Sequence, residues 1–186
     1  MVKAIQKRAG NDDPIIIQSW GRSYQVLEQK PNHALFSMSR LPQREALFKW
    51  VGPIADNETY FFKKKGSDID IKNLEDAKKV KLIGAGAETN VDFIELKSKG
   101  FTNLSTLDTQ SNPINLVVNN RVDLGGSNPL TALFHLKKNN FPLDSIVNTG
   151  VQVFSVPLYI AFSLETSDEV IRSEEHTSEL QSPNTI

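Results

Sequence analysis

The feature that most constrains the fold of this 186-residue chain is the alternation of short β-rich runs with helical stretches. Apolar spacing and caps predict helices at 2–9, 20–30, 42–47, 73–77, 89–99, 113–119, 128–139 and from 166 onward. Strand-forming runs lie at 14–18, 33–38, 48–51, 59–63, 80–84, 104–107, 121–124, 146–148, 151–156 and 159–162. The pattern predicts an α/β fold, and 39% hydrophobic residues suffice for one ordinary domain or two small ones.

Composition excludes several functional classes. With a formal net charge of -1, the chain lacks the excess positive charge that is typical of nucleic-acid binders, so we expect no nucleic-acid partner. No apolar run approaches the roughly 18–20 residues that span a bilayer, so we expect no membrane-spanning segment. With no cysteine there is no disulfide or thiolate site, and His33 and His135 have no partner at metal-ligand spacing, so we expect no metal. Gly84-Ala-Gly86 lacks the third glycine of a dinucleotide-binding turn, and we expect no cofactor.

Both ends of the chain read as if they were cut from a longer protein. A helical pattern begins directly after Met1 with no secretory signal, which predicts that the chain starts inside a longer gene. Residues 172–183 read RSEEHTSELQSP, which a widely used sequencing adapter would encode. We therefore expect 172–186 to be an artefactual, disordered tail. A polar tail that evolved with the protein is the alternative.

Four strings in order resemble the family 3 solute-binding proteins of bacterial ABC importers, of the polar amino-acid-binding type. They are FSMSRLPQREALFKWVGPI (36–54), NLEDAKKVKLIGAG (73–86), NNRVDLGGSNP (119–129) and PLYIAFSLETSDEV (157–170). The resemblance implies the type II periplasmic-binding-protein fold, with two α/β lobes, a hinge of two crossover strands, and the ligand between the lobes. It implies lobe 1 without its first strand at 1–55, lobe 2 with the crossover strands at 56–159, and a truncated return into lobe 1 at 160–171.

The resemblance also implies a set of ligand-binding residues. Arg44 matches the arginine that pairs with the ligand carboxylate, since a planar guanidinium can hold a carboxylate through two parallel hydrogen bonds. A surface arginine paired with Glu45 is the alternative, and Arg40 is a competing candidate. The other expected ligand-binding residues are Ser37, Ser39, Thr89, Asn90 and Asn128.

Each of these other residues has a structural alternative. Ser37 and Ser39 could cap a strand end, and Thr89 or Asn90 could simply cap the following helix. Asn128 stands where such binders often carry an acid, so either another acid substitutes or the ligand is not a standard α-amino acid. Asp123 is expected to be structural. For the aromatic residues Trp20, Phe36 and Trp50, core packing is favoured over a ligand wall.

The function implied is capture of a small polar, amino-acid-like solute outside the cytoplasm by a monomer that delivers it to ABC permease subunits. The full-length protein would then be periplasmic or extracellular, with its signal peptide absent from this chain. The alternatives are a lyase or peptidoglycan-acting enzyme on the same fold, or the sensor lobe of a receptor. Glu88 is the one candidate acid or base for an enzyme, and no residues near it in the sequence complete a catalytic group with it.

Overall fold

The structure is a computed structural model that describes residues 2–88, 90–105 and 112–172. The chain divides into two compact units, of which unit 1 holds the residues up to Asp56 and those from Val156 onward. Unit 2 is Asn57–Ser155. Two long strands, β2 (Phe48–Lys64) and β6 (Ile146–Ser163), each contribute residues to both units. Among the described helices, none is long and apolar enough to cross a membrane.

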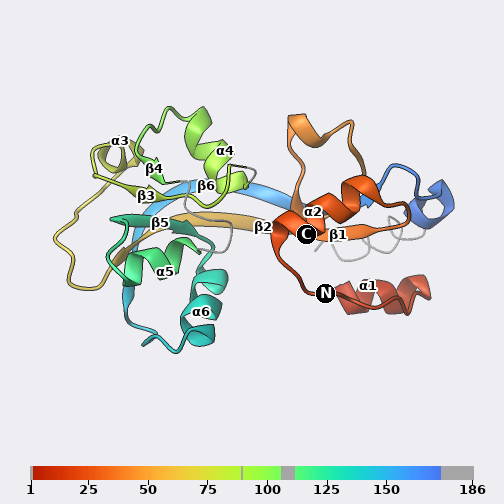
Figure 1. The fold of residues 1–186 in the computed structure, drawn as a ribbon, viewed down its shortest axis with the longest axis horizontal. Helices are drawn as coiled ribbons and strands as arrows, with labels where there is room; N and C mark the ends of the chain where they lie inside the picture. Colours follow the sequence, from red (N-terminus) through yellow and green to blue (C-terminus); the bar gives the residue numbers. More distant parts are fainter. Residues whose placement is uncertain (1, 89, 106–111, 173–186) are drawn as a thin grey trace, which may run out of the picture. The chain divides into compact units, whose positions relative to one another are not determined.

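Unit 1 contains α1 (Val2–Ala9), α2 (Trp20–Gln29), β1 (Ala34–Ser39) and the 3-10 helix η1 (Pro42–Arg44), as Figure 1 shows. Strand β1 pairs antiparallel with β6, from Ala34 opposite Phe162 to Ser39 opposite Leu158. The helices bury apolar side chains against this pair. Helix α1 contributes Ile5 to a cluster with Val51 and Ile160, and α2 contributes Leu27 to a separate cluster that includes Met38 and Phe48.

Unit 2 alternates strands and helices, as the sequence predicts. Its elements are α3 (Leu74–Ala77), β3 (Ile83–Gly84), α4 (Val91–Ser98), β4 (Leu104–Ser105), α5 (Pro113–Val118), β5 (Leu124–Ser127) and α6 (Pro129–Lys138). Strand β3 pairs in parallel with both β4 and β5, while β5 pairs antiparallel with β2. The strands are hydrogen-bonded in the order β1-β6-β2-β5-β3-β4. The α/β fold class is therefore confirmed.

Two adjacent glycines show which helices cover the two faces of β5. A Cβ on Gly125 would lie 2.9 Å from the carbonyl oxygen of Pro113, at the start of α5. A Cβ on Gly126 would instead lie 3.8 Å from the carboxylate Oδ1 of Asp92, at the start of α4. Because successive residues of a strand face opposite sides, α4 and α5 lie on opposite faces of the sheet in unit 2, as Figure 1 shows. Helix α6 lies on the α5 side, since both pack around Phe62.

Several sequence predictions need correction. The run at 14–18 is not a strand, and Ile17 is 94% exposed there. The runs at 48–51 and 59–63 are parts of the single strand β2, and the three runs from 146 to 162 are parts of β6. Strand β5 begins at Leu124, where the run expected at 121–124 ends. Of the tail expected at 172–186, only Arg172 lies within the described residues, at the end of a short helix over 168–172.

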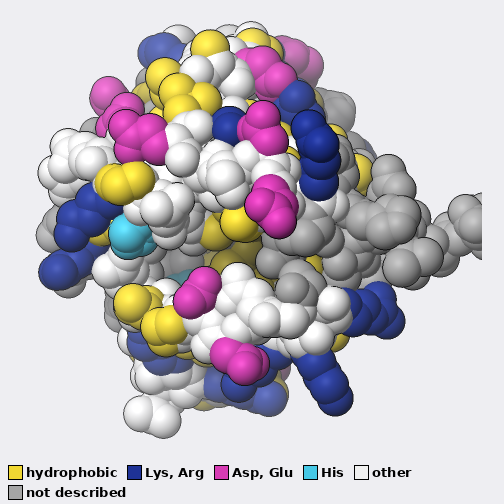
Figure 2. Space-filling model, turned by 90° about the vertical axis from the view of Figure 1, so that its right-hand side faces the viewer, with side chains coloured by type: hydrophobic (Ala, Val, Ile, Leu, Met, Phe, Trp, Pro, Cys, Tyr) yellow, Lys and Arg dark blue, Asp and Glu magenta, His cyan; other side chains and the backbone are white. Residues whose placement is uncertain are grey.

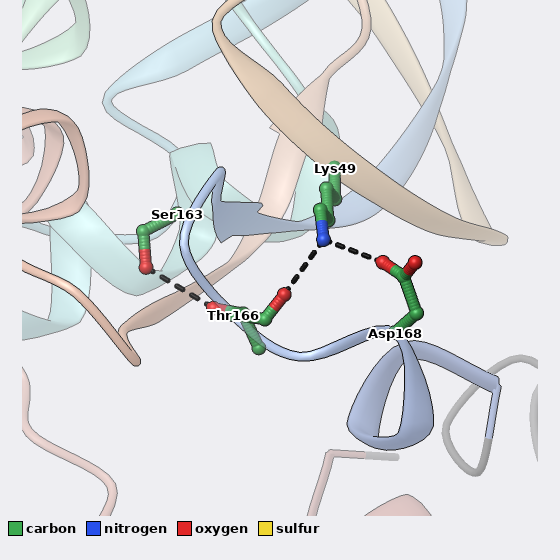
Figure 3. A network of polar contacts seen from close by, with 4 residues as sticks. All are labelled: Lys49, Ser163, Thr166 and Asp168. Atoms are coloured by element: carbon green, nitrogen blue, oxygen red, sulfur yellow. Dashed lines mark hydrogen bonds and ion pairs between the residues drawn. The ribbon is translucent and has the colours of Figure 1, made fainter.

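A small polar network fixes the chain where β6 leaves the sheet of unit 1 (Figure 3). The ammonium of Lys49 donates to the carbonyl oxygen of Thr166 at 2.7 Å and to the carboxylate of Asp168 at 2.5 Å. The hydroxyl groups of Thr166 and Ser163 are hydrogen-bonded at 3.1 Å, and both residues are buried. These bonds satisfy polar groups that would otherwise be costly to bury.

Candidate functional site

The most informative part of unit 2 is the edge where its parallel strands β3 and β5 end. The chain leaves β3 through residues 85–90 to reach α4 on one face of the sheet, and leaves β5 through Asn128 to reach α6 on the other. Open α/β sheets bind ligands beyond the carboxyl ends of strands whose connections diverge in this way. We call residues 85–88 and Asn90, together with Ser127 and Asn128, the carboxyl edge of unit 2.

The loop before α4 contains three residues that the sequence singles out. Asn90 has the N-cap position of α4, but its side chain makes no cap hydrogen bond. Its amide instead lies over Gly86, where a Cβ would come within 2.6 Å of Nδ2, and Gly86 also has a φ of 73° that favours glycine. Glu88 is exposed. Thr89 lies outside the described residues.

Asn128 caps α6, and both ends of its side chain have partners. The amide oxygen accepts a hydrogen bond from the backbone N–H of Leu130 at 3.0 Å. The amide nitrogen donates to the carbonyl oxygen of Glu58 on β2 at 3.3 Å. The residue thus ties the start of α6 to β2 and brings no charge to the carboxyl edge. Asp123 has a structural role, as expected, because its carboxylate accepts the backbone N–H of Leu82 at 3.0 Å.

An acid that the sequence reasoning missed lies beside this edge. Asp92, in the first turn of α4, accepts a hydrogen bond from the hydroxyl of Thr59, which is 1% exposed. Burial is the largest influence on this carboxyl group and raises its pKa to about 7. The sequence does hold a signal, since Asp92 lies among the apolar residues Val91, Phe93 and Ile94.

In unit 1, the expected site residues lie where β1 ends. Ser37 is an extra, exposed residue in β1, since Phe36 pairs with Ile160 and Met38 with the adjacent Tyr159. Its φ of 61° is uncommon for a side chain other than glycine, and such conformations concentrate at functional sites. Ser39 is buried, and its carbonyl oxygen accepts a hydrogen bond from Nη1 of Arg44 at 3.1 Å. The structure thus brings Ser39 and Arg44 together.

Arg44 is a buried residue, which corrects the alternative of a surface arginine paired with Glu45. It is 4% exposed, and its guanidinium lies 5.4 Å from the ring centroid of Trp20 and 5.5 Å from that of Tyr24, both on α2. Burial lowers the pKa of this guanidinium, against smaller opposing effects of Tyr24. A desolvated guanidinium beside aromatic rings is typical of an arginine held in a defined orientation.

Arg40 is the arginine that pairs with Glu45. Its Nε donates to one carboxylate oxygen of Glu45 at 2.8 Å, and its Nη2 contacts the other. The same guanidinium lies over the rings of Trp50 and Tyr159. This bidentate pair is about half exposed and holds Arg40 on the surface of unit 1.

The remaining candidates have structural surroundings. Trp20 and Trp50 pack against the cluster that contains Leu27 and Phe48, and Phe36 packs against the one that contains Ile5, so the preference for core packing is confirmed. His33 is exposed and bonded to the carbonyl oxygen of Pro31. In the part of the chain that the structure describes, no group of three or more His, Cys, Asp or Glu side chains could hold a metal.

Charged side chains of both signs are interspersed over the face drawn in Figure 2. That face therefore carries no extended patch of purely positive or purely negative charge.

No protein-family profile and no curated protein matches the chain. Solved structures do match it. One is an ancestral arginine-binding protein bound to glutamine, with a TM-score of 0.78 and 21% identity, covering 98% of this chain and 80% of the other. A second is the arginine-, lysine-, histidine-binding protein ArtJ from Geobacillus stearothermophilus, with a TM-score of 0.75 and 16% identity, covering 96% and 76%.

A third similar structure is a histidine kinase sensor domain described as similar to periplasmic binding proteins. Its TM-score is 0.80 at 15% identity, and the match covers 97% of this chain and 77% of the other. At such identities the likeness establishes the fold. The chain has the fold of the periplasmic binding proteins.

Proposed function

We propose that this chain is a solute-binding protein that captures a small polar, amino-acid-like ligand outside the cytoplasm and delivers it to an ABC importer. The observation that carries the proposal is the match of 96% or more of the chain to proteins whose names state that they bind arginine, lysine or histidine, or that hold glutamine. Two α/β units that share two long strands suit capture by hinge closure.

The proposed ligand-binding residues come from both units. In unit 1 they are Arg44, for a carboxylate, with Ser37 and Ser39 at the end of β1. In unit 2 they are Thr89, Asn90 and Asn128 around the carboxyl edge. The buried, oriented guanidinium of Arg44 and the uncommon backbone conformation of Ser37 support the first group. The two hydrogen bonds of the Asn128 side chain hold this residue in place at the start of α6.

Calorimetric titration of the chain with each of the twenty common amino acids tests this function. We expect at least one to bind with micromolar affinity or better, and to emerge chemically unchanged after prolonged incubation. Turnover of the bound compound would support an enzyme instead, and absence of binding across the panel would contradict the proposal.

A sensor lobe of a receptor is the second candidate, which the similarity to the histidine kinase sensor domain favours. Both candidates bind a solute, so titration alone does not separate them. The gene that encodes this fold and the genes beside it do separate them. A permease and ATPase pair beside a gene that ends after this fold supports the importer, and a continuation into a kinase supports the sensor.

A further inference from the structure

Helix α6 of unit 2, teal in Figure 1, has apolar side chains on two sides, and the described part of the chain buries one of them. Ala132 and Leu136 pack into an apolar cluster inside the unit. By contrast, Leu130, Leu133 and Phe134 are 78%, 43% and 58% exposed. At 3.6 residues per turn these three side chains share a strip about 100° wide, away from the buried pair. We call them the apolar face of α6.

The two ends of this face differ in charge. At the carboxyl end of the helix, one turn beyond Phe134, Lys137 is exposed and takes part in none of the ion pairs of the described residues. At the other end lies Glu58 of β2, whose carbonyl oxygen accepts a hydrogen bond from the helix cap Asn128 at 3.3 Å.

The carboxylate of Glu58 lies on the side of β2 that α6 covers. It accepts a hydrogen bond from the hydroxyl of Tyr60 at 3.2 Å, and Tyr60 packs against the cluster that contains Ala132 and Leu136 of α6. Glu58 is itself exposed, so its carboxylate remains accessible beside the start of the helix. The exposed apolar strip thus runs from an acid at the amino end of α6 to a base at its carboxyl end.

A second copy of the same face complements this pattern in one orientation. If two α6 helices meet antiparallel about a twofold axis, their apolar faces cover each other and Lys137 of each copy approaches Glu58 of the other. Leu133 is midway between Asn128 and Lys138, so the axis passes near it. A parallel pair would instead bring Lys137 and Lys138 of both copies together, which like-charge repulsion disfavours.

We propose that the apolar face of α6 is a dimerisation surface, through which two copies of this chain pair antiparallel with Glu58 of each copy against Lys137 of the other. Such a contact is isologous, since both copies use the same patch. The inference goes beyond the proposed function and replaces the monomer that the resemblance implies. The face is small beside the roughly 20–30 residues a side of a stable interface, so we expect monomer and dimer to exchange.

Sedimentation equilibrium over a range of protein concentrations tests the proposal on the wild type, on Phe134→Ser and on the control Leu143→Ser. Leu143 is 50% exposed in the same unit but lies outside α6. We expect wild-type dimers to appear between about 1 µM and about 1 mM, and Phe134→Ser to raise the dimer Kd at least about tenfold, because buried aromatic residues dominate such contacts. Leu143→Ser should match the wild type.

A wild type that stays monomeric over this range overturns the proposal and leaves the face to a partner of another kind. Equal dimer Kd values for Phe134→Ser and the wild type overturn it as well. None of these measurements uses a solute, so their outcome is independent of the proposed function.

Charge reversal tests the antiparallel arrangement. In a dimer of Glu58→Lys chains, or of Lys137→Glu chains, both cross-copy pairs join like charges, so each variant alone should dimerise more weakly than the wild type. A mixed dimer of one Glu58→Lys chain and one Lys137→Glu chain restores both pairs. We therefore expect an equimolar mixture to dimerise more strongly than either variant alone. A mixture no stronger than its components contradicts the arrangement.

Disulfide trapping locates the axis in an otherwise native chain, because the sequence contains no cysteine. Under mild oxidation, Leu133→Cys should cross-link two copies rapidly, since the two sulfur atoms meet near the axis. The control Thr131→Cys places an exposed cysteine on another side of the same helix and should cross-link far more slowly. Equal rates for the two variants overturn the proposed surface.

Discussion

Arg44 is buried, and its planar guanidinium has the shape that binds a carboxylate. Substitutions can separate the effects of these two properties. We expect Arg44→Ala to weaken binding of the amino acid that the chain captures by at least about tenfold, since hydrogen bonds to charged groups contribute about 1.5–3 kcal/mol each. Arg44→Lys should recover only part of the affinity, because an ammonium cannot reproduce the two parallel bonds of a guanidinium. Titration calorimetry measures both.

The matched control is Arg40→Ala, which removes a guanidinium already paired with Glu45. It should change affinity less than Arg44→Ala does. Thermal unfolding of each variant shows whether unit 1 remains folded, a necessary check because Arg44 also lies against Trp20 and Tyr24. Unchanged affinity in folded Arg44→Ala would remove this residue from the site.

Asp92 should also make folding stability depend on pH. Its pKa is about 7 in the folded chain against an ordinary value of 3.8, so the folded state holds the extra proton between these values. Stability from this group is therefore fully present below about pH 4 and is lost as the pH rises through 7. Asp92→Asn keeps a neutral side chain throughout. Urea denaturation should show the free energy of unfolding of this variant rising relative to that of the wild type from pH 5 to pH 8, by at most about 3 kcal/mol. A difference in the free energy of unfolding that does not change with pH would contradict the raised pKa of Asp92.

At single positions, the sequence identifies residue types but not their surroundings. The structural role of Asp123 follows from local pattern, and the structure confirms it. The sequence could not predict that Glu45 pairs with Arg40 and not with Arg44. The position of Arg44 depends on the rings of Trp20 and Tyr24, which α2 supplies from a distant part of the chain. The contact of Asp92 with Thr59 likewise joins two elements more than thirty residues apart.

Among the elements, helices were predicted more closely than strands. The α-helices carry their own signals, such as the stops at Gly10 and Gly100, both with positive φ. Strand limits depend on partner strands, and the separated β-rich runs proved to be continuous in β2 and β6, each of which is hydrogen-bonded to neighbouring strands. The run at 14–18 has β-forming residues without a described strand beside it, and it remains irregular.

The two glycines of β5 give a prediction at this scale. A methyl group on Gly125 would lie 2.9 Å from both the carbonyl oxygen of Pro113 and Cγ2 of Val117, and backbone cannot move aside cheaply. On Gly126 it would meet Thr59 at 3.5 Å, an ordinary contact. We expect Gly125→Ala to lower the free energy of unfolding by about 1–3 kcal/mol, and the control Gly126→Ala by clearly less. Urea denaturation monitored by circular dichroism compares them. Equal losses would contradict the close packing of α5 on β5.

For the molecule as a whole, the two units should differ in stability. In unit 2, β5 has hydrogen-bonded neighbours on both sides and helices on both faces, and its four residues are all buried. In unit 1, β1 is the last strand in the sheet order, so among the described strands it has only β6 beside it. Backbone hydrogen bonds at such an edge open without unfolding the rest of the sheet.

Hydrogen exchange followed by mass spectrometry tests this difference in increasing urea. Peptides that contain Leu124–Ser127 should keep their amide protons to higher urea than peptides that contain Ala34–Ser39, and peptides over 14–18 should exchange at once. A ligand that closes the two units should raise protection in both, since it stabilises the folded state by binding to it alone. Exchange of β5 before β1 in the free chain would show that unit 1 holds the more stable core, against the arrangement of strands and helices described here.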